Sequence, residues 1–157
     1  MDLLSFMKKA IKDVDGKETA LCDGFQFTIE QWEECKKKRK TAKNGVIYGF
    51  AINLNESKKL ELLSEVKRRK TKNKDLIKIE EIFDSYYILY WGKSIDADGR
   101  GQAHVKGHKN WNLHLDGYEC LKNYPIEYAF VYVENYEDIE RKLISKYPPL
   151  LRTVKAL

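Results

Sequence analysis

The sequence lacks the features that mark secreted and membrane proteins. No apolar run approaches the roughly 18 residues that a membrane-spanning helix needs. The first 13 residues carry three lysines instead of the apolar centre of a signal peptide. The cysteines, Cys22, Cys35 and Cys120, form no Cys-x-x-Cys pair, and their odd number does not suit a disulfide framework. We therefore expect a cytoplasmic protein with no membrane partner.

Features that divide a chain are also missing. The sequence shows no internal repeat and no low-complexity linker, and 157 residues suit one domain with its own core. We therefore treat residues 1–157 as a single domain. The net charge of +5 arises from 29 basic against 24 acidic residues, and the basic residues are clustered, which favours a polyanionic partner.

Hydrophobic periodicity predicts a mixture of helices and strands. Helices are expected over 2–14, from Thr28 to the basic run 36–40, and over 56–70, 113–124 and 136–147, and strands over 46–52, 86–91 and 126–133. Residues 75–83 fit both periods and are interpreted as a helix, and 96–110 as partly helical. Thr28 and Gln31 have the spacing of a capping box. In helix 56–70, Leu60, Leu63 and Val66 form the expected buried side.

One carboxylate lies on the apolar side of its predicted helix. Glu140 is spaced by −4, +3, +4 and +7 from the apolar residues Tyr136, Leu143, Ile144 and Tyr147. An inward carboxylate must be paired, neutralised or bound to a cation. The alternative is a Glu at the edge of the stripe that reaches water or Arg100.

Polar groups follow the predicted strand 86–91. Gly92, Lys93 and Ser94 come directly after it, and Arg100 and His104 are four residues apart, which places both on one face of a helix. A guanidinium suits phosphate oxygens, and an imidazole titrates near neutral pH, so together they indicate phosphodiester chemistry. Taken alone, such a pair is more often a feature of the solvated surface, and it gains weight only from the residues around it.

The order and spacing of these motifs resemble the GIY-YIG nuclease superfamily. The resemblance covers residues 44–152 and is carried by Val46-Ile47-Tyr48, Tyr90-Trp91-Gly92, Lys93, Arg100, His104, and Glu140-Arg141-Lys142-Leu143-Ile144 before Pro148 and Pro149. Val46 replaces the first Gly of the family name, Trp91 replaces the Ile, and Arg152 stands where many members have Asn. The two tyrosine motifs are about 40 residues apart, which implies an insertion over 54–84 and leaves 1–43 as an N-terminal helical extension.

The resemblance implies an α+β fold with a small three-stranded antiparallel sheet flanked by helices, and an endonuclease that hydrolyses DNA. Glu140 would hold one divalent cation, Mg²⁺ or Mn²⁺, and Mg²⁺ needs few protein ligands because it keeps most of its waters. Arg100 would neutralise the non-bridging oxygens, and Tyr48 would be the general base or orient water, with a pKa lowered by Lys93 and the metal. Tyr90 and His104 would complete the network, with His104 the competing base. Aromatic residues in strands are more often core residues, which is the alternative for Tyr48 and Tyr90.

Basic residues outside the catalytic set are the predicted DNA contacts. They are Lys36, Lys37, Lys38, Arg39, Lys67, Arg68, Arg69, Lys106 and Lys109. Such residues grip the phosphate backbone without reading sequence, although a solvated helix end is an equal interpretation of 36–40. No zinc finger or helix-turn-helix is evident, which favours a restriction-type or phage-type enzyme. Cutting both strands calls for a homodimer on DNA or sequential nicking. The competing interpretation is a non-catalytic nucleic-acid-binding module on the same fold.

Overall fold

The fold is an antiparallel β-sheet with helices packed on it. The structure is a computed structural model that describes residues 2–32, 45–68, 81–83, 85–94, 105 and 115–151. Its elements are α1 (Leu3–Asp13), β1 (Glu18–Phe27), η1 (Ile29–Gln31), β2 (Val46–Asn53), α3 (Glu56–Arg68), β3 (Glu81–Phe83), β4 (Tyr86–Ser94), η2 (Leu115–Gly117), η3 (Glu119–Leu121), β5 (Ile126–Val133) and α5 (Tyr136–Lys146), where η marks a 3₁₀ helix. The α+β class is therefore as expected.

Within the part of the chain that the structure describes, the sheet has five strands instead of the three that were predicted. Its order is β1-β5-β2-β4-β3, and every pair is antiparallel. The three predicted strands, β2, β4 and β5, are confirmed and lie side by side, with β2 between the other two. Nearly all of β2 is apolar and buried, as expected for a central strand covered on both faces. The correction is the addition of one strand at each edge.

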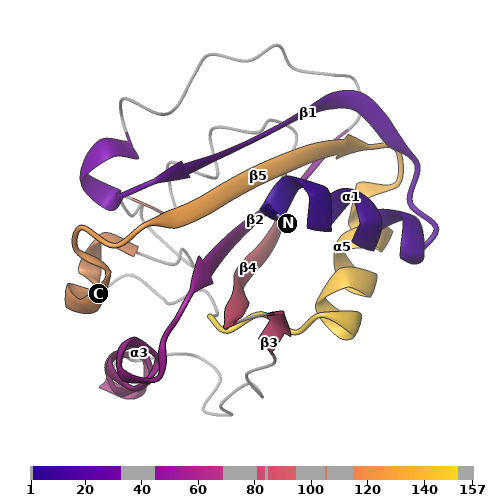
Figure 1. The fold of residues 1–157 in the computed structure, drawn as a ribbon. Helices are drawn as coiled ribbons and strands as arrows, with labels where there is room; N and C mark the ends of the chain where they lie inside the picture. The colour runs from indigo at the N-terminus through magenta and orange to yellow at the C-terminus, as the bar shows by residue number, and fades with distance from the viewer. Residues whose placement is uncertain are drawn as a thin grey trace.

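The first edge strand comes from the segment expected to be a helical extension. Within 1–43, helix α1 is confirmed, but β1 pairs with β5 from Phe27↔Ile126 to Glu18↔Val133 (Figure 1). Asp23 and Gly24 interrupt the strand's apolar pattern, and both residue types are rare in strands, which is why periodicity did not reveal it. The N-terminal region is therefore part of the sheet.

Two further local predictions are wrong. Thr28 precedes the short 3₁₀ helix η1 but makes no capping hydrogen bond with its side chain, so the predicted capping box is not formed; residues 33–44 lie outside the described part of the chain. The predicted helix over 75–83 is a strand at β3, because pairing with β4 overrides an ambiguous local pattern, and 75–80 lie outside the described residues.

Helix α3 is confirmed, but its buried side is rotated from the prediction. Leu62 is fully buried and Leu60 is 63% exposed, while Leu63 and Val66 pack at the margin of the core. The helix predicted over 113–124 is two 3₁₀ turns, η2 and η3, in its described part.

The two faces of the sheet carry different cores. One, which we call the aromatic face, includes Tyr48, Phe50, Tyr128 and Phe130, and is covered by side chains from η1, α3, η2 and η3. The other, the helix face, includes Ile47, Ala51, Ile88, Trp91 and Val131, and is covered by α1 and α5. Figure 1 shows α1 and α5 next to each other, away from α3. Alternation along β2 therefore decides which side chains meet α5.

A carboxylate on β5 ties the N-terminal helix to the sheet. Glu127 Oε2 accepts a hydrogen bond from the backbone N–H of Leu3 at 2.9 Å, and Oε1 accepts one from the hydroxyl of Tyr86 at 2.6 Å. Burial, and then this bond to Glu127, raise the pKa of Tyr86, so the phenol stays protonated. An acidic group at a helix N-terminus also complements the helix dipole.

Replacing Glu127 by alanine is expected to lower the free energy of unfolding by about 1–3 kcal/mol, because two donors lose their acceptor. Urea denaturation followed by circular dichroism measures the change. Glu134→Ala is the matched control, since Glu134 is exposed just beyond the other end of β5. Equal stability of the two variants would contradict the anchoring role.

Candidate active site

The site is built where β2 begins and β4 ends. Tyr48 pairs with Gly92 across these strands, and Ile47 pairs with Lys93. The Tyr48 ring lies over Gly92 so closely that a Cβ added to the glycine would stand 2.1 Å from Cζ and 2.3 Å from the hydroxyl oxygen. Gly92 was expected to end the strand; β4 instead continues to Ser94. The glycine is needed because the phenol occupies the space of a side chain.

The second predicted tyrosine lies on the same face. A β-bulge in β4 between Tyr90 and Ile88 turns Tyr90 toward the aromatic face, where it packs at the core margin. The ring centroids of Tyr48 and Tyr90 are 6.3 Å apart. Tyr48 is 1% exposed and Tyr90 is half-buried. The two phenols are therefore neighbours, with Tyr90 the more accessible.

Helix α5 crosses the other face of the same strands. At its beginning, the Tyr136 ring covers Gly45, where an added Cβ would stand 2.4 Å from Cδ1. At its end, the Trp91 indole N–H donates to the carbonyl of Tyr147 at 2.9 Å. Glu140 lies between these two contacts, so the sheet end holds the helix on both sides of the carboxylate.

The predicted inward position of Glu140 is half right. Leu143 is buried, and Tyr136 and Tyr147 are half-buried, but Ile144 is 38% exposed and the stripe is completed by buried Ile139. Glu140 is therefore at the border of the apolar stripe.

Two charges act on this carboxylate in addition to its burial. Burial raises the pKa of Glu140, Lys93 lowers it, and Glu137 raises it again. Lys93 lies on the helix face because it pairs with Ile47. Its charge counteracts the burial and favours the ionised form of Glu140, the form that binds cations.

The raised pKa of Glu140 has a consequence for stability. A group whose pKa is higher in the folded state stabilises the protein below its ordinary pKa, here 4.5, and that contribution is lost as the pH rises through the folded pKa. Glu140→Gln is therefore expected to raise the Tm at pH 7 by about 1–3 °C. The difference should disappear below pH 4.5, where the wild-type carboxyl is also neutral. Thermal scans at several pH values test this, and a difference that is independent of pH would contradict it.

The described residues give two pairs of the predicted catalytic groups. Tyr48 and Tyr90 share the aromatic face, while Lys93 lies on the helix face, where its charge lowers the pKa of Glu140, and the strand step from Gly92 to Lys93 connects the pairs. Lys93 thus acts on Glu140, and its side chain points away from the Tyr48 ring. Arg100 and His104 lie outside the described residues.

The donor chemistry at Glu140 suits the predicted metal. Carboxylate oxygens are preferred ligands of Mg²⁺, which keeps several waters and is commonly held by one or two carboxylates. Within the described ranges, no group of three or more His, Cys, Asp and Glu residues could hold a metal ion. A site at Glu140 is therefore a one-carboxylate site as far as the described chain extends. The three histidines, His104, His108 and His114, lie outside it.

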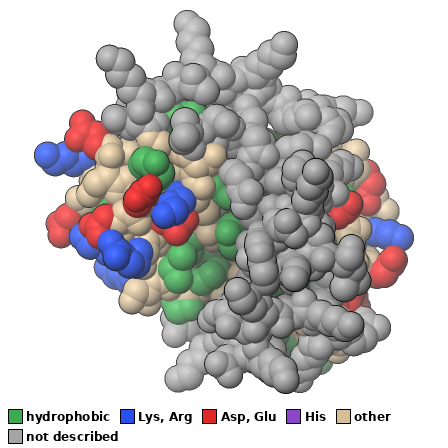
Figure 2. Space-filling model, turned by 180° about the vertical axis from the view of Figure 1, so that it is seen from behind, with side chains coloured by type: hydrophobic (Ala, Val, Ile, Leu, Met, Phe, Trp, Pro, Cys, Tyr) green, Lys and Arg blue, Asp and Glu red, His purple; other side chains and the backbone are tan. Residues whose placement is uncertain are grey.

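The predicted DNA contacts lie almost entirely outside the described part. Lys67 and Arg68 belong to α3, but their side chains are not described, and the remaining predicted contacts fall in undescribed segments. Where the surface is described, Figure 2 shows Lys and Arg beside Asp and Glu. On α5, for example, Asp138 pairs with both Arg141 and Lys142. The described surface of α5 is therefore of mixed charge.

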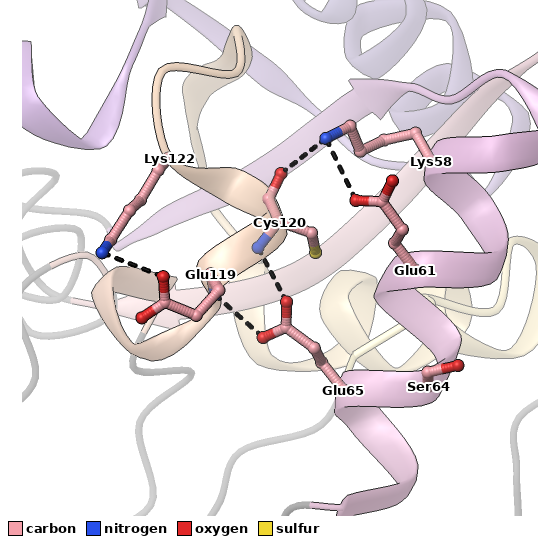
Figure 3. Close-up of a pocket in the computed structure, with 7 residues that line it drawn as sticks. All are labelled: Lys58, Glu61, Ser64, Glu65, Glu119, Cys120 and Lys122. Carbon is pink, nitrogen blue, oxygen red and sulfur yellow. Dashed lines mark hydrogen bonds and ion pairs between the residues drawn. The ribbon is translucent and has the colours of Figure 1, made fainter.

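A second polar site, which the sequence did not reveal, joins α3 to η3. An open cleft of about 400 Å³ lies between them, and Figure 3 shows the residues that line it. Glu65 accepts hydrogen bonds from the backbone N–H groups of Glu119 and Cys120 at 2.9 and 2.7 Å, and Lys58 donates to the Cys120 carbonyl at 3.1 Å. These partners are more than 50 residues apart in the chain, so no local pattern could connect them.

The cleft is an anchor and not a reactive centre. Burial, and then the hydrogen bond with Glu65, raise the pKa of the Cys120 thiol to about 12. The thiol is therefore protonated at neutral pH and is a poor nucleophile. The hydrogen bonds across the cleft hold α3, at the start of the predicted basic insertion, against the 115–121 turns.

Comparison with known proteins found no match for this chain. No protein-family model, no curated protein and no solved structure matches the chain. Among the described helices, none combines the length and apolar character required to cross a membrane.

Proposed function

We propose that the protein is a divalent-metal-dependent endonuclease of the GIY-YIG type that hydrolyses DNA phosphodiester bonds. The observation that carries the proposal is the end of the β2–β4 pair. There Tyr48 lies over Gly92, and the next residue, Lys93, faces the half-buried Glu140 of α5. Strand β2 carries the first tyrosine motif and β4 carries the second, and β2 lies between β4 and β5. Both of these pairings are antiparallel.

The chemistry follows from what each side chain can do. Hydrolysis adds water to phosphorus and breaks the bond to the 3′ oxygen, so charge builds on the phosphate and on the leaving oxygen. Glu140 would hold Mg²⁺ or Mn²⁺, and the cation, when bound, would supply stabilisation of that leaving oxygen. The charge of Lys93 favours the ionised form of Glu140 against the effect of burial, and Arg100 would neutralise the non-bridging oxygens. Tyr48 or His104 accepts the proton of water, and Tyr90 orders the hydrogen-bond network.

The direct test is incubation with supercoiled and with single-stranded DNA, in Mg²⁺ or in EDTA. We expect nicking of DNA by the wild type in Mg²⁺, none in EDTA, and none from Glu140→Ala in Mg²⁺. Nicking by a homodimer on DNA, or by successive single cuts, is separated by the order in which nicked and linear forms accumulate. Equal nicking by wild type and Glu140→Ala would reject the proposal.

The burial of Tyr48 favours a second candidate function. A phenol that is 1% exposed is a core residue by the ordinary rule for aromatic side chains in strands. A non-catalytic nucleic-acid-binding module on this fold needs no accessible phenol. Such a protein binds DNA with strong salt dependence but nicks it in neither Mg²⁺ nor Mn²⁺.

A further inference from the structure

Three hydrogen bonds attach the end of α5 to β4. The Trp91 indole N–H donates to the carbonyl of Tyr147 at 2.9 Å. After two prolines, which have no N–H, the backbone N–H groups of Leu150 and Leu151 donate to the carbonyls of Ile88 and Leu89, each at 2.8 Å. The last carbonyls of a helix have no partner within it, so the indole satisfies one of these groups at a buried position. Trp91 itself is 1% exposed.

The indole is the one group in this contact that an apolar side chain cannot imitate. Tryptophan is a donor only, and neither isoleucine nor phenylalanine offers an N–H there. Phe6 of α1 stacks on the indole at 6.4 Å and 24° and meets the Tyr147 ring edge-on at 5.1 Å. The indole therefore packs against α1 on one side, while its N–H reaches the Tyr147 carbonyl. Trp91, one of the residues that depart from the family pattern, is thus the residue that joins strand and helix.

The helix carries the effect of this contact to Glu140. Tyr147 is seven positions after Glu140, about 10 Å along the axis and two turns, so both lie on the same side of the helix. Lys93 is two positions after Trp91, about 7 Å along the strand and on the same face. The end of the helix is therefore held at Trp91, and the charge of Lys93 acts on Glu140 further along the same pair of elements.

We propose that Trp91 is a positioning residue, whose hydrogen bond to the Tyr147 carbonyl sets the place of the Glu140 carboxylate relative to Lys93 and the end of the sheet. The part of this inference that concerns catalysis rests on the proposed nuclease function. The part that concerns geometry does not. In this role Trp91 contacts neither the metal nor the DNA.

The test compares Trp91→Phe with Phe6→Leu. The first variant keeps an aromatic ring and removes the donor, whereas the second loosens the same cluster and keeps the donor. Crystal structures of the wild type and both variants, without DNA or metal, give the position of Glu140 relative to β4. We expect a displacement of about 1 Å in Trp91→Phe and none in Phe6→Leu, a misplacement large enough to matter for catalysis.

Activity and metal binding are then measured on the same proteins. Loss of a group that orients a metal ligand costs about 10–100-fold in metal affinity or rate. We expect Trp91→Phe to weaken Mn²⁺ binding, measured by calorimetry, and to lower kcat by that factor while KM stays within about twofold. Phe6→Leu should change neither, even at equal or greater loss of stability.

The outcomes separate the two proposals. If Glu140 keeps its position in Trp91→Phe, or if Phe6→Leu displaces it equally, the positioning role is overturned whether or not the protein cuts DNA. If Glu140 is displaced only in Trp91→Phe but the wild type does not nick DNA, the positioning role stands and the nuclease proposal fails.

Discussion

Glu140→Gln is expected to lower the rate of DNA nicking in Mg²⁺ by about 10²–10⁴-fold. The amide keeps the size of the carboxylate but loses the charge that holds the cation. Glu140 is the one carboxylate that the proposal assigns to the metal, so its loss is expected to weaken cation binding directly. The rate is measured as conversion of supercoiled to nicked DNA at saturating protein, over a range of Mg²⁺ concentrations.

Two features make this test specific. Glu137→Gln removes a negative charge one turn earlier on the same helix, at an exposed position, and should leave nicking within about twofold. The stability of Glu140→Gln at neutral pH should equal or exceed that of the wild type, because burial raises the pKa of the carboxyl. Loss of activity in a protein that is no less stable cannot be attributed to unfolding. Full activity in Glu140→Gln would remove Glu140 from the mechanism.

Gly92→Ala is expected to cost about 1–3 kcal/mol of stability and at least about tenfold in nicking rate. The added methyl group would stand 2.1 Å from Cζ of Tyr48, and that ring is buried between Phe50, Tyr90 and Tyr128. The ring must therefore shift, together with its hydroxyl. Urea denaturation and nicking assays measure the two effects.

Gly49→Ala is the matched control. An alanine there would meet the Trp91 ring at 3.3 Å, so the neighbour needs to move by only a few tenths of an ångström. A second comparison is the double variant Gly92→Ala with Tyr48→Leu, in which the clash is relieved and the two stability costs should be less than additive. Strict additivity would show that Gly92 matters for a reason other than the Tyr48 ring.

The predicted elements divide according to how local their signals are. Strands β2, β4 and β5 are rich in β-branched and aromatic residues, and α1 and α5 have clear helical periodicity, so each was recognised from its own residues. Strand β1 carries Asp23 and Gly24, and β3 is only three residues long. Both strands form because they pair with a neighbouring strand of the sheet, and the local residue pattern contains no information about that pairing.

Within the site, the local sequence around Gly92 likewise did not reveal the contact that this residue makes. A glycine before a lysine and a serine has the local appearance of a strand end. A glycine is needed there because the Tyr48 ring fills the space of a side chain. Tyr48 is more than 40 residues earlier and lies opposite Gly92 only after β2 and β4 pair. The association of Lys93 with Glu140 likewise depends on which face of β4 the lysine occupies, and the β-bulge at Ile88 takes part in setting that alternation.

By itself, the sequence determined the class of the fold, the central strands, the two helices of the helix face, and the presence of a carboxylate near the apolar side of α5. Those properties depend on periodicity, and periodicity is a property of neighbouring residues. The tertiary structure decided that Tyr48 lies over Gly92, that Lys93 faces Glu140 and that Trp91 holds the end of α5. Each of these contacts joins residues that are distant in the chain, so each arises only when strands pair in register and a helix packs across them.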